Sequence, residues 1–227
     1  MIGPILLAIS WLLLRLEGKR LDVLGFDAPW LRLRQFAFGF LAAGAVATMQ
    51  QLGLSLATGV PWRFNPSVDV LYGLRWNVNS VLYEELLFRG YLLYQAIRFL
   101  GLRRGVLLDA VAFGIYHWFS FGAFGNPVAM VFILLFTGAF GFMFAFSFAK
   151  TKGVAAPIGL HLGWNLISYL GFSAGPLGRG LFVPANGAAR IQASGAMALL
   201  LDVGVPLALV GFVCWYLRSD RVSPTMD

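Results

Sequence analysis

This sequence has little charge for its length. Only 12% of its 227 residues are Asp, Glu, Lys or Arg, against about 25% in soluble domains. One cysteine, Cys214, excludes an internal disulfide framework, and histidine occurs only twice. Hydrophobic residues instead make up 59% of the chain and gather in long runs. Lipid rather than water must therefore be the main solvent of this chain.

The apolar runs predict an all-α fold, a polytopic membrane helix bundle of about seven spans with a polar cavity inside the membrane. Most runs approach the ~20 residues with which a helix crosses a hydrocarbon core. The third run is too long for one plain span, and we expect it to tilt or break. The seven runs cover residues 1–16, 35–59, 68–100, 105–121, 128–149, 153–172 and 194–217. They predict a single integral membrane domain over residues 1–227.

The basic residues lie at the ends of the apolar runs, a distribution that sets orientation in a membrane. If the N-terminus lies outside, twelve of the 17 Lys and Arg residues fall on the cytoplasmic side. These are Arg15, Lys19, Arg20, Arg32, Arg34, Arg98, Arg103, Arg104, Lys150, Lys152, Arg218 and Arg221, whereas Arg63, Arg179 and Arg190 fall outside. The bias predicts an outer N-terminus and a cytoplasmic C-terminus, and we favour a bacterial inner membrane. The net charge of +7 follows this pattern, so we expect no nucleic-acid partner.

The stretch VLYEELLFRGYLLYQ, residues 81–95, places three charges within six positions of an apolar run. Each would cost about 2.5–3.5 kcal/mol at a bilayer centre. Glu85 and Arg89 are four residues apart, so a helix lets them pair and gives them an orienting role. Glu84 lies about 100° around the helix, which leaves it available as a general base. An ion-pair cluster joining two helices is the alternative, and these residues alone do not decide between the two.

Both histidines fall inside predicted spans, His117 in FGIYHW and His161 in GLHLGWN. A lone buried histidine is commonly a packing residue, but two with none elsewhere are harder to explain in that way. Asn165 follows His161 by four residues and shares its helix face. Pro157 precedes His161 by four and is expected to bend or loosen that helix. A broken helix beside polar side chains indicates a cavity.

Other polar residues receive simpler interpretations. The polar positions around Asn77 predict an interfacial helix with one wet face. Asp109 follows Arg103 and Arg104, which predicts a helix cap or a local ion pair. Asp202, inside the last apolar run, has no evident partner in the sequence.

Three segments together resemble a known family. EELLFR at 84–89, FGIYH at 113–117 and HLGWN at 161–165 resemble the EExxxR, FxxxH and HxxxN motifs of the CPBP family, the CAAX proteases and bacteriocin-processing enzymes also called Abi proteins. They occur in the family's order, each in a separate predicted helix, within residues 68–172. The resemblance implies an intramembrane endopeptidase, similar to the type II CAAX prenyl endopeptidase, with its catalytic core in that range. Its substrate would be a membrane-embedded or lipidated, for example prenylated, peptide or protein.

The resemblance also implies a role for each motif residue. Glu84 would be the base that activates a water, with His117 as its partner, and His161 with Asn165 would stabilise the oxyanion. Members of the family are often labelled metalloproteases, and Glu84, His117 and His161 would suffice as ligands for a divalent metal such as zinc. We prefer a metal-free mechanism, because it accounts better for Asn165.

Two other functions remain as alternatives. Buried carboxylates and histidines also form proton relays in ion- or proton-coupled transporters, although no internal repeat supports that fold. An inactive scaffold is the second alternative, and the complete set of motif residues argues against it.

Overall fold

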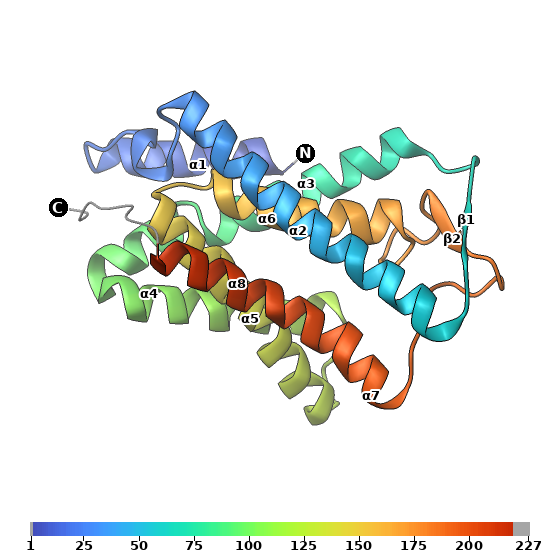
Figure 1. The fold of residues 1–227 in the computed structure, drawn as a ribbon. Coiled ribbons are helices and arrows are strands. Elements are labelled where there is room, and N and C mark those ends of the chain that lie inside the picture. Colours follow the sequence, from blue (N-terminus) through green and yellow to red (C-terminus); the bar gives the residue numbers. More distant parts are fainter. Residues whose placement is uncertain (1, 220–227) are drawn as a thin grey trace.

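The computed structural model describes residues 2–219, which form a helical bundle with two short strands at one end (Figure 1). Arg221, counted above for membrane orientation, lies outside the described residues. The first half of the chain contains α1 (Gly3–Leu16), the 3₁₀ turn η1 (Leu21–Leu24), α2 (Pro29–Thr58), β1 (Trp62–Phe64) and α3 (Val70–Phe88). The second half contains α4 (Tyr91–Ser120), α5 (Pro127–Thr151), α6 (Ala155–Asn165), η2 (Leu166–Gly171), β2 (Phe182–Pro184), α7 (Gly195–Ala198), η3 (Leu199–Gly204) and α8 (Val205–Ser219). Both η2 and η3 are π-helical.

The fold is nearly all-α, with one correction to the prediction. β1 and β2 form an antiparallel pair in which Arg63 lies opposite Val183. Each strand has only three residues, too few for an alternating pattern to be recognised in the sequence. The pair ties the segment after α2 to the segment after η2 at one end of the bundle.

The long run 68–100 breaks, as expected. Asp69 caps α3 by accepting a hydrogen bond from the Tyr72 amide at 2.8 Å, α3 ends at Phe88 and α4 begins at Tyr91. Gly101 has a φ of 77° and kinks α4, so the predicted segment 105–121 continues that helix after the kink. The predicted number of about seven spans is not established.

Three helical segments are long and apolar enough to cross a membrane, among the residues that the structure describes. They are Leu21–Thr58, Pro127–Thr151 and Gly195–Arg218. Large apolar side chains also cover the outer surface, including Leu56 at 85% and Val128 at 80% exposure. Such a surface is stable in lipid and would aggregate in water.

Backbones touch where α6 packs on α2, because glycine faces the contact. A Cβ on Gly159 would lie 2.2 Å from the Phe36 carbonyl oxygen, and one on Gly163 would lie 2.3 Å from that of Phe40. α4 and α5 approach in the same way at Gly114, where a Cβ would lie 2.8 Å from the Leu134 oxygen. Small residues allow such close packing of membrane helices. Two helices that carry motif residues, α6 and α4, are therefore held rigidly against their neighbours.

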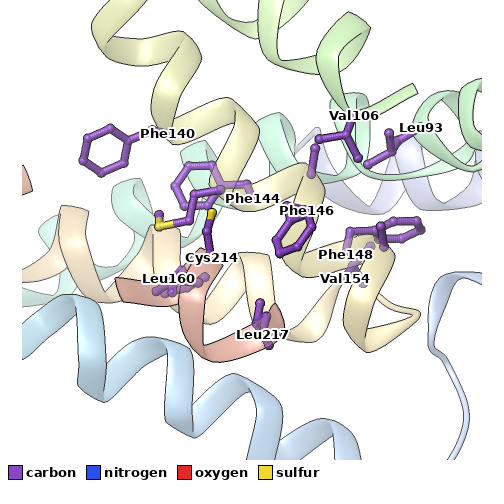
Figure 2. Close-up of a cluster of buried hydrophobic side chains, with 14 of the residues drawn as sticks. Leu93, Val106, Phe140, Phe144, Phe146, Phe148, Val154, Leu160, Cys214 and Leu217 are labelled. Carbon is purple, nitrogen blue, oxygen red and sulfur yellow. The ribbon is translucent and has the colours of Figure 1, made fainter. Parts of the chain in front are cut away.

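Phenylalanines of α5 form the centre of the main core. Figure 2 shows Phe144, Phe146 and Phe148 of α5 between side chains of α4, such as Val106, and side chains of α8, such as Leu217. Phe144 and Phe148 are each 2% exposed. Cys214 is buried in this cluster, where its side chain packs as an apolar group.

The contacts of basic residues differ between the two ends of the bundle. At one end, Arg98 pairs with Glu17 at 2.7 Å and the Arg32 guanidinium donates to the Thr151 carbonyl at 2.7 Å. These contacts join segments that carry most of the basic residues. At the other end lie the paired strands with Arg63. The predicted distribution of basic residues across the membrane, and the side that faces the cytoplasm, stay predictions.

Two local predictions were wrong. Asn77 does not lie on a wet face: it is fully buried and donates to the Gly73 carbonyl at 2.9 Å, while Leu71 of the same helix is 77% exposed. At this point of α3 a polar side chain therefore points into the bundle and a leucine points outward, the arrangement expected in lipid, while Arg75 is exposed. Pro157 lies in the first turn of α6, where a missing N–H removes no helical hydrogen bond. The irregularity comes later, in η2.

Candidate active site

The two adjacent glutamates near the end of α3 have different surroundings. The side chains of Glu85 and Arg89 are both 0% exposed, whereas that of Glu84 is 12% exposed. This difference follows from the helix, which turns about 100° between neighbouring residues. One carboxylate is thus enclosed in the bundle, and the other lies at the edge of an accessible space.

The Arg89 guanidinium joins three helices. Its Nη1 lies 3.3 Å from Glu85 Oε1, so the predicted pair forms, and its Nη2 donates to the Gly141 carbonyl of α5 at 3.1 Å. Its Nε lies 3.2 Å from Asp109 Oδ2 of α4, and the guanidinium stacks over the Phe113 ring at 4.2 Å. Opposite charge and hydrogen bonds are what allow an arginine to remain charged when fully buried.

The prediction for Asp109 was wrong. It neither caps a helix nor pairs locally with Arg103 or Arg104, because it lies inside α4 and reaches Arg89. A signal for this role is present in the sequence. Asp109, Phe113 and His117 are spaced by four residues and so occupy one face of the helix. The face of α4 that carries His117 therefore also carries the Asp109 carboxylate, which lies against Arg89.

His161 is held by a carboxylate. Its Nδ1 lies 2.7 Å from Glu85 Oε1, and its ring stacks on Phe144 with centroids 4.8 Å apart and planes inclined by 15°. The contact with Glu85 fixes one ring nitrogen and the stacking fixes the ring plane. Its other nitrogen, Nε2, lies 3.9 Å from Glu84 Oε2.

His117 is held by the backbone instead. Its Nδ1 lies 2.8 Å from the Phe113 carbonyl oxygen, one turn earlier in α4. A carbonyl only accepts hydrogen bonds, so Nδ1 carries the proton and donates. Its Nε2 also lies 3.9 Å from Glu84 Oε2.

Glu84 Oε2 therefore faces two imidazole nitrogens that come from two other helices. This oxygen is buried and accepts no hydrogen bond within the described residues. A separation of 3.9 Å is too long for a direct hydrogen bond, but it is a distance over which a water molecule can link two polar groups. α3, α4 and α6 thus bring two ring nitrogens within 3.9 Å of one carboxylate oxygen.

The structure brings together Glu84, Glu85, Arg89, His117 and His161, all of them expected from the motifs. Asn165 is also buried, one turn after His161 in α6. Its part in the site stays a prediction, as do the catalytic roles of the others. Asp202 is exposed on η3, and the charge of Arg190, in the segment that follows β2, acts on it without an ion pair between the two.

The metal question is separate from this geometry. Across residues 2–219, no group of three or more His, Cys, Asp or Glu side chains is arranged to hold a metal ion. The Nδ1 atoms of both histidines already face protein acceptors. The zinc set Glu84, His117 and His161 stays an untested prediction.

Comparison with known proteins supports the interpretation of the motifs. A family model described as type II CAAX prenyl endopeptidase Rce1-like matches residues 66–167, a range that holds all three motif segments. No curated protein and no solved structure matches the chain. The transporter alternative is not favoured by this finding. Residues 66–167 of this integral membrane protein thus match the Rce1-like family of type II CAAX prenyl endopeptidases.

Proposed function

We propose that this protein is an intramembrane endopeptidase that hydrolyses a peptide bond with a water molecule activated by Glu84 and His117. Its substrate is a membrane-associated or lipidated peptide. The observation that carries this proposal is the position of Glu84 Oε2, 3.9 Å from Nε2 of both histidines and without a hydrogen-bond partner among the described residues. A carboxylate and an imidazole on one water form a general-base arrangement.

The two histidines take different protonation states in this mechanism. The proton on His117 Nδ1 donates to the Phe113 carbonyl, so a neutral ring leaves Nε2 free to accept a proton. His161 donates from Nδ1 to the Glu85 carboxylate. If its Nε2 is protonated too, His161 is cationic and donates toward the reacting carbonyl.

Arg89 contacts two buried carboxyl groups, those of Glu85 and Asp109. Burying an uncompensated charge is strongly unfavourable, and the set is neutral when either His161 or one of the two carboxyl groups carries an additional proton. The proposed mechanism uses the state in which His161 carries it and Nε2 can donate.

The reaction then follows in balanced steps. A water between Glu84 and His117 gives one proton to Glu84, and its oxygen adds to the carbonyl carbon of the substrate. The resulting oxyanion accepts hydrogen bonds from His161 Nε2 and the Asn165 amide. The carbon–nitrogen bond breaks, and the leaving amine takes the proton from Glu84. No covalent bond to the enzyme forms.

The first test is cleavage of a peptide library by the purified protein in detergent. Glu84→Gln and His117→Gln should each lower kcat by about 10²–10⁴-fold, the usual contribution of general-base groups. Glu17→Gln is the matched control, because Glu17 is an exposed glutamate that receives hydrogen bonds from other residues. Cleavage that persists in Glu84→Gln, or no cleavage by the wild type on any peptide, contradicts the proposal.

A chelator decides the metal question in the same assay. We expect activity to survive chelation, because the proposed mechanism needs only protein groups and water. Loss of activity that zinc restores would replace the glutamate mechanism by the zinc-dependent form of the same peptidase.

A further inference from the structure

A polar cavity of about 390 Å³ lies between the start of α3 and the segment that follows η2. Ligand pockets in proteins usually have volumes of about 300–1,000 Å³. Its walls include Asn65, Asp69, Tyr72, Tyr169 and Arg179. The cavity is at the end of the bundle that carries the paired strands, and neither motif histidine lines it.

Hydrogen bonds hold the walls of this cavity in place. Asn65 donates from its side chain to the Gly180 carbonyl at 3.0 Å and from its backbone to the Leu181 carbonyl at 2.8 Å. The Gly180 amide donates to Ser173 Oγ at 2.7 Å. The backbone on both sides of Arg179 is therefore fixed, and the cavity is formed before any ligand enters.

The cavity walls carry one positive side chain, Arg179, and one negative side chain, Asp69. The Asp69 carboxylate accepts from the Tyr72 amide at 2.8 Å and so caps α3. Arg179 has no acidic side chain within 4.0 Å in the part of the chain that the structure describes. Its guanidinium is a planar donor suited to carboxylates and phosphates. Arg179 is thus the group of this cavity that suits an anionic ligand, and it lies in the segment after η2 rather than at the helix cap.

The cavity lies along α3 from the candidate active site. Tyr169 lines it and packs edge-to-face on Trp76 of α3, with ring centroids 6.3 Å apart. Along α3, Gly73 of the cavity wall and Glu84 are roughly 16 Å apart at about 1.5 Å per residue. An extended peptide covers that distance with about five residues.

We propose that this cavity is a substrate subsite, in which Arg179 binds an anionic group of the peptide about five residues from the bond that is hydrolysed. The proposal rests on the peptidase function proposed above and adds a substrate class to it. The anion is either a free C-terminal carboxylate or an acidic side chain at that distance.

The test measures peptide binding separately from cleavage. Four fluorescent peptides share one sequence and differ in one group: a free C-terminus, an amidated C-terminus, an internal Glu about five residues from the cleaved bond, and Gln in its place. Binding to the full-length protein in detergent is measured by anisotropy, with kcat and KM for any peptide that is cleaved. Tighter binding of the free acid than of its amide would show that the C-terminal carboxylate supplies the anion. Tighter binding of the Glu peptide than of the Gln peptide would show that an acidic side chain supplies it.

Arg179→Gln should weaken binding of the anionic peptide by about tenfold, a typical effect for one charged hydrogen-bonded contact. We expect the neutral peptides to bind as before, and KM to rise with little change in kcat. Arg63→Gln is the control, since Arg63 is an exposed arginine at the same end of the bundle that does not line the cavity. Arg179→Glu should reverse the preference and favour a peptide with Lys at the same position.

The outcomes separate the two proposals. Equal binding of charged and neutral peptides by the wild type, or equal losses in Arg179→Gln and Arg63→Gln, overturns the subsite. Cleavage without any charge preference would leave the peptidase function in place and remove the subsite. Binding that depends on Arg179 without cleavage of any peptide would support the subsite and contradict the peptidase function.

Discussion

Two carboxylates in this protein each gather donors from other helices, one inside the bundle and one at its surface. In the buried cluster, which we define as Glu85, Arg89, Asp109 and His161, the side chains of Glu85 and Arg89 are 0% exposed. The rim cluster consists of Glu17 with its three donors, Tyr91, Gln95 and Arg98. There the side chain of Arg98 is 46% exposed. In both clusters a carboxylate contacts several donors, but the first carboxylate is enclosed by protein and the second is open to solvent.

The comparison shows that solvent access, more than the number of contacts, decides how much a charged group contributes to the stability of the fold. Water solvates the rim cluster whether or not its contacts form, so its ion pair adds little to stability. The buried cluster has no water to replace a missing partner, so each loss leaves an uncompensated group. A buried network of this kind can also fix the orientation of a side chain that takes part in chemistry. Here that side chain is His161.

The largest expected effect on stability comes from Arg89→Gln. The change leaves Glu85 and Asp109 facing each other without their shared cation, which should lower the free energy of unfolding by about 3–5 kcal/mol. Thermal unfolding in detergent measures it. The matched variant is Arg98→Gln, which removes the arginine of the rim cluster and should have a several-fold smaller effect. Equal losses in the two variants would contradict the distinction between the clusters.

Glu85→Gln tests whether the buried cluster serves chemistry as well as stability. The amide keeps the shape of the side chain but removes the negative charge that His161 faces at 2.7 Å. We expect kcat to fall about 10²–10³-fold, the usual effect of losing one oxyanion donor, while KM changes little. The measurement is steady-state cleavage of the best library peptide. A variant that folds and retains full kcat would show that Glu85 has only a structural role.

Asp109→Asn should have a smaller effect and should separate the two roles. Arg89 keeps its contacts with Glu85 and the Gly141 carbonyl, so we expect a loss of about 1–3 kcal/mol in unfolding free energy. kcat should stay within a few-fold of the wild type, because Asp109 does not contact His161 or Glu84. A loss of kcat as large as that of Glu85→Gln would show that the whole cluster acts on the chemistry.

Much of the candidate site could be predicted from the sequence because its residues follow helical spacing. Glu85 with Arg89, and His161 with Asn165, are each four residues apart, and a helix alone places such pairs on one face. The sequence also separates Glu84 from Glu85, since neighbouring residues on a helix cannot share one environment. These inferences need no knowledge of how the helices pack.

The contacts between helices could not be predicted in the same way. Asp109 was assigned to Arg103 and Arg104 because sequence distance was the only distance available, whereas packing of α4 on α3 and α5 brings it to Arg89. Asn77 was placed on a wet face because in water the apolar stripe of a helix faces inward. In lipid the preference reverses, and the buried Asn77 with the exposed Leu71 follows that rule.

The smallest expected effect is on thermal stability: Glu17→Gln in the rim cluster should change Tm slightly, and the change should depend on pH. The pKa of Glu17 lies below its ordinary value, chiefly because the Tyr91 hydroxyl donates to it, with further contributions from Gln95 and Arg98. A lowered folded pKa means that Glu17 stabilises the fold above the unfolded value near 4.5, and that this contribution disappears as pH falls through the folded value. Wild type should therefore have a slightly higher Tm than Glu17→Gln at pH 7, and the difference should shrink as pH falls below 4.5 and vanish once Glu17 is protonated in the folded protein as well. High salt at pH 7 should also reduce it, because exposed charges are screened. A difference that survives both acid and salt would mean that the rim cluster is shielded from water in the way the buried cluster is.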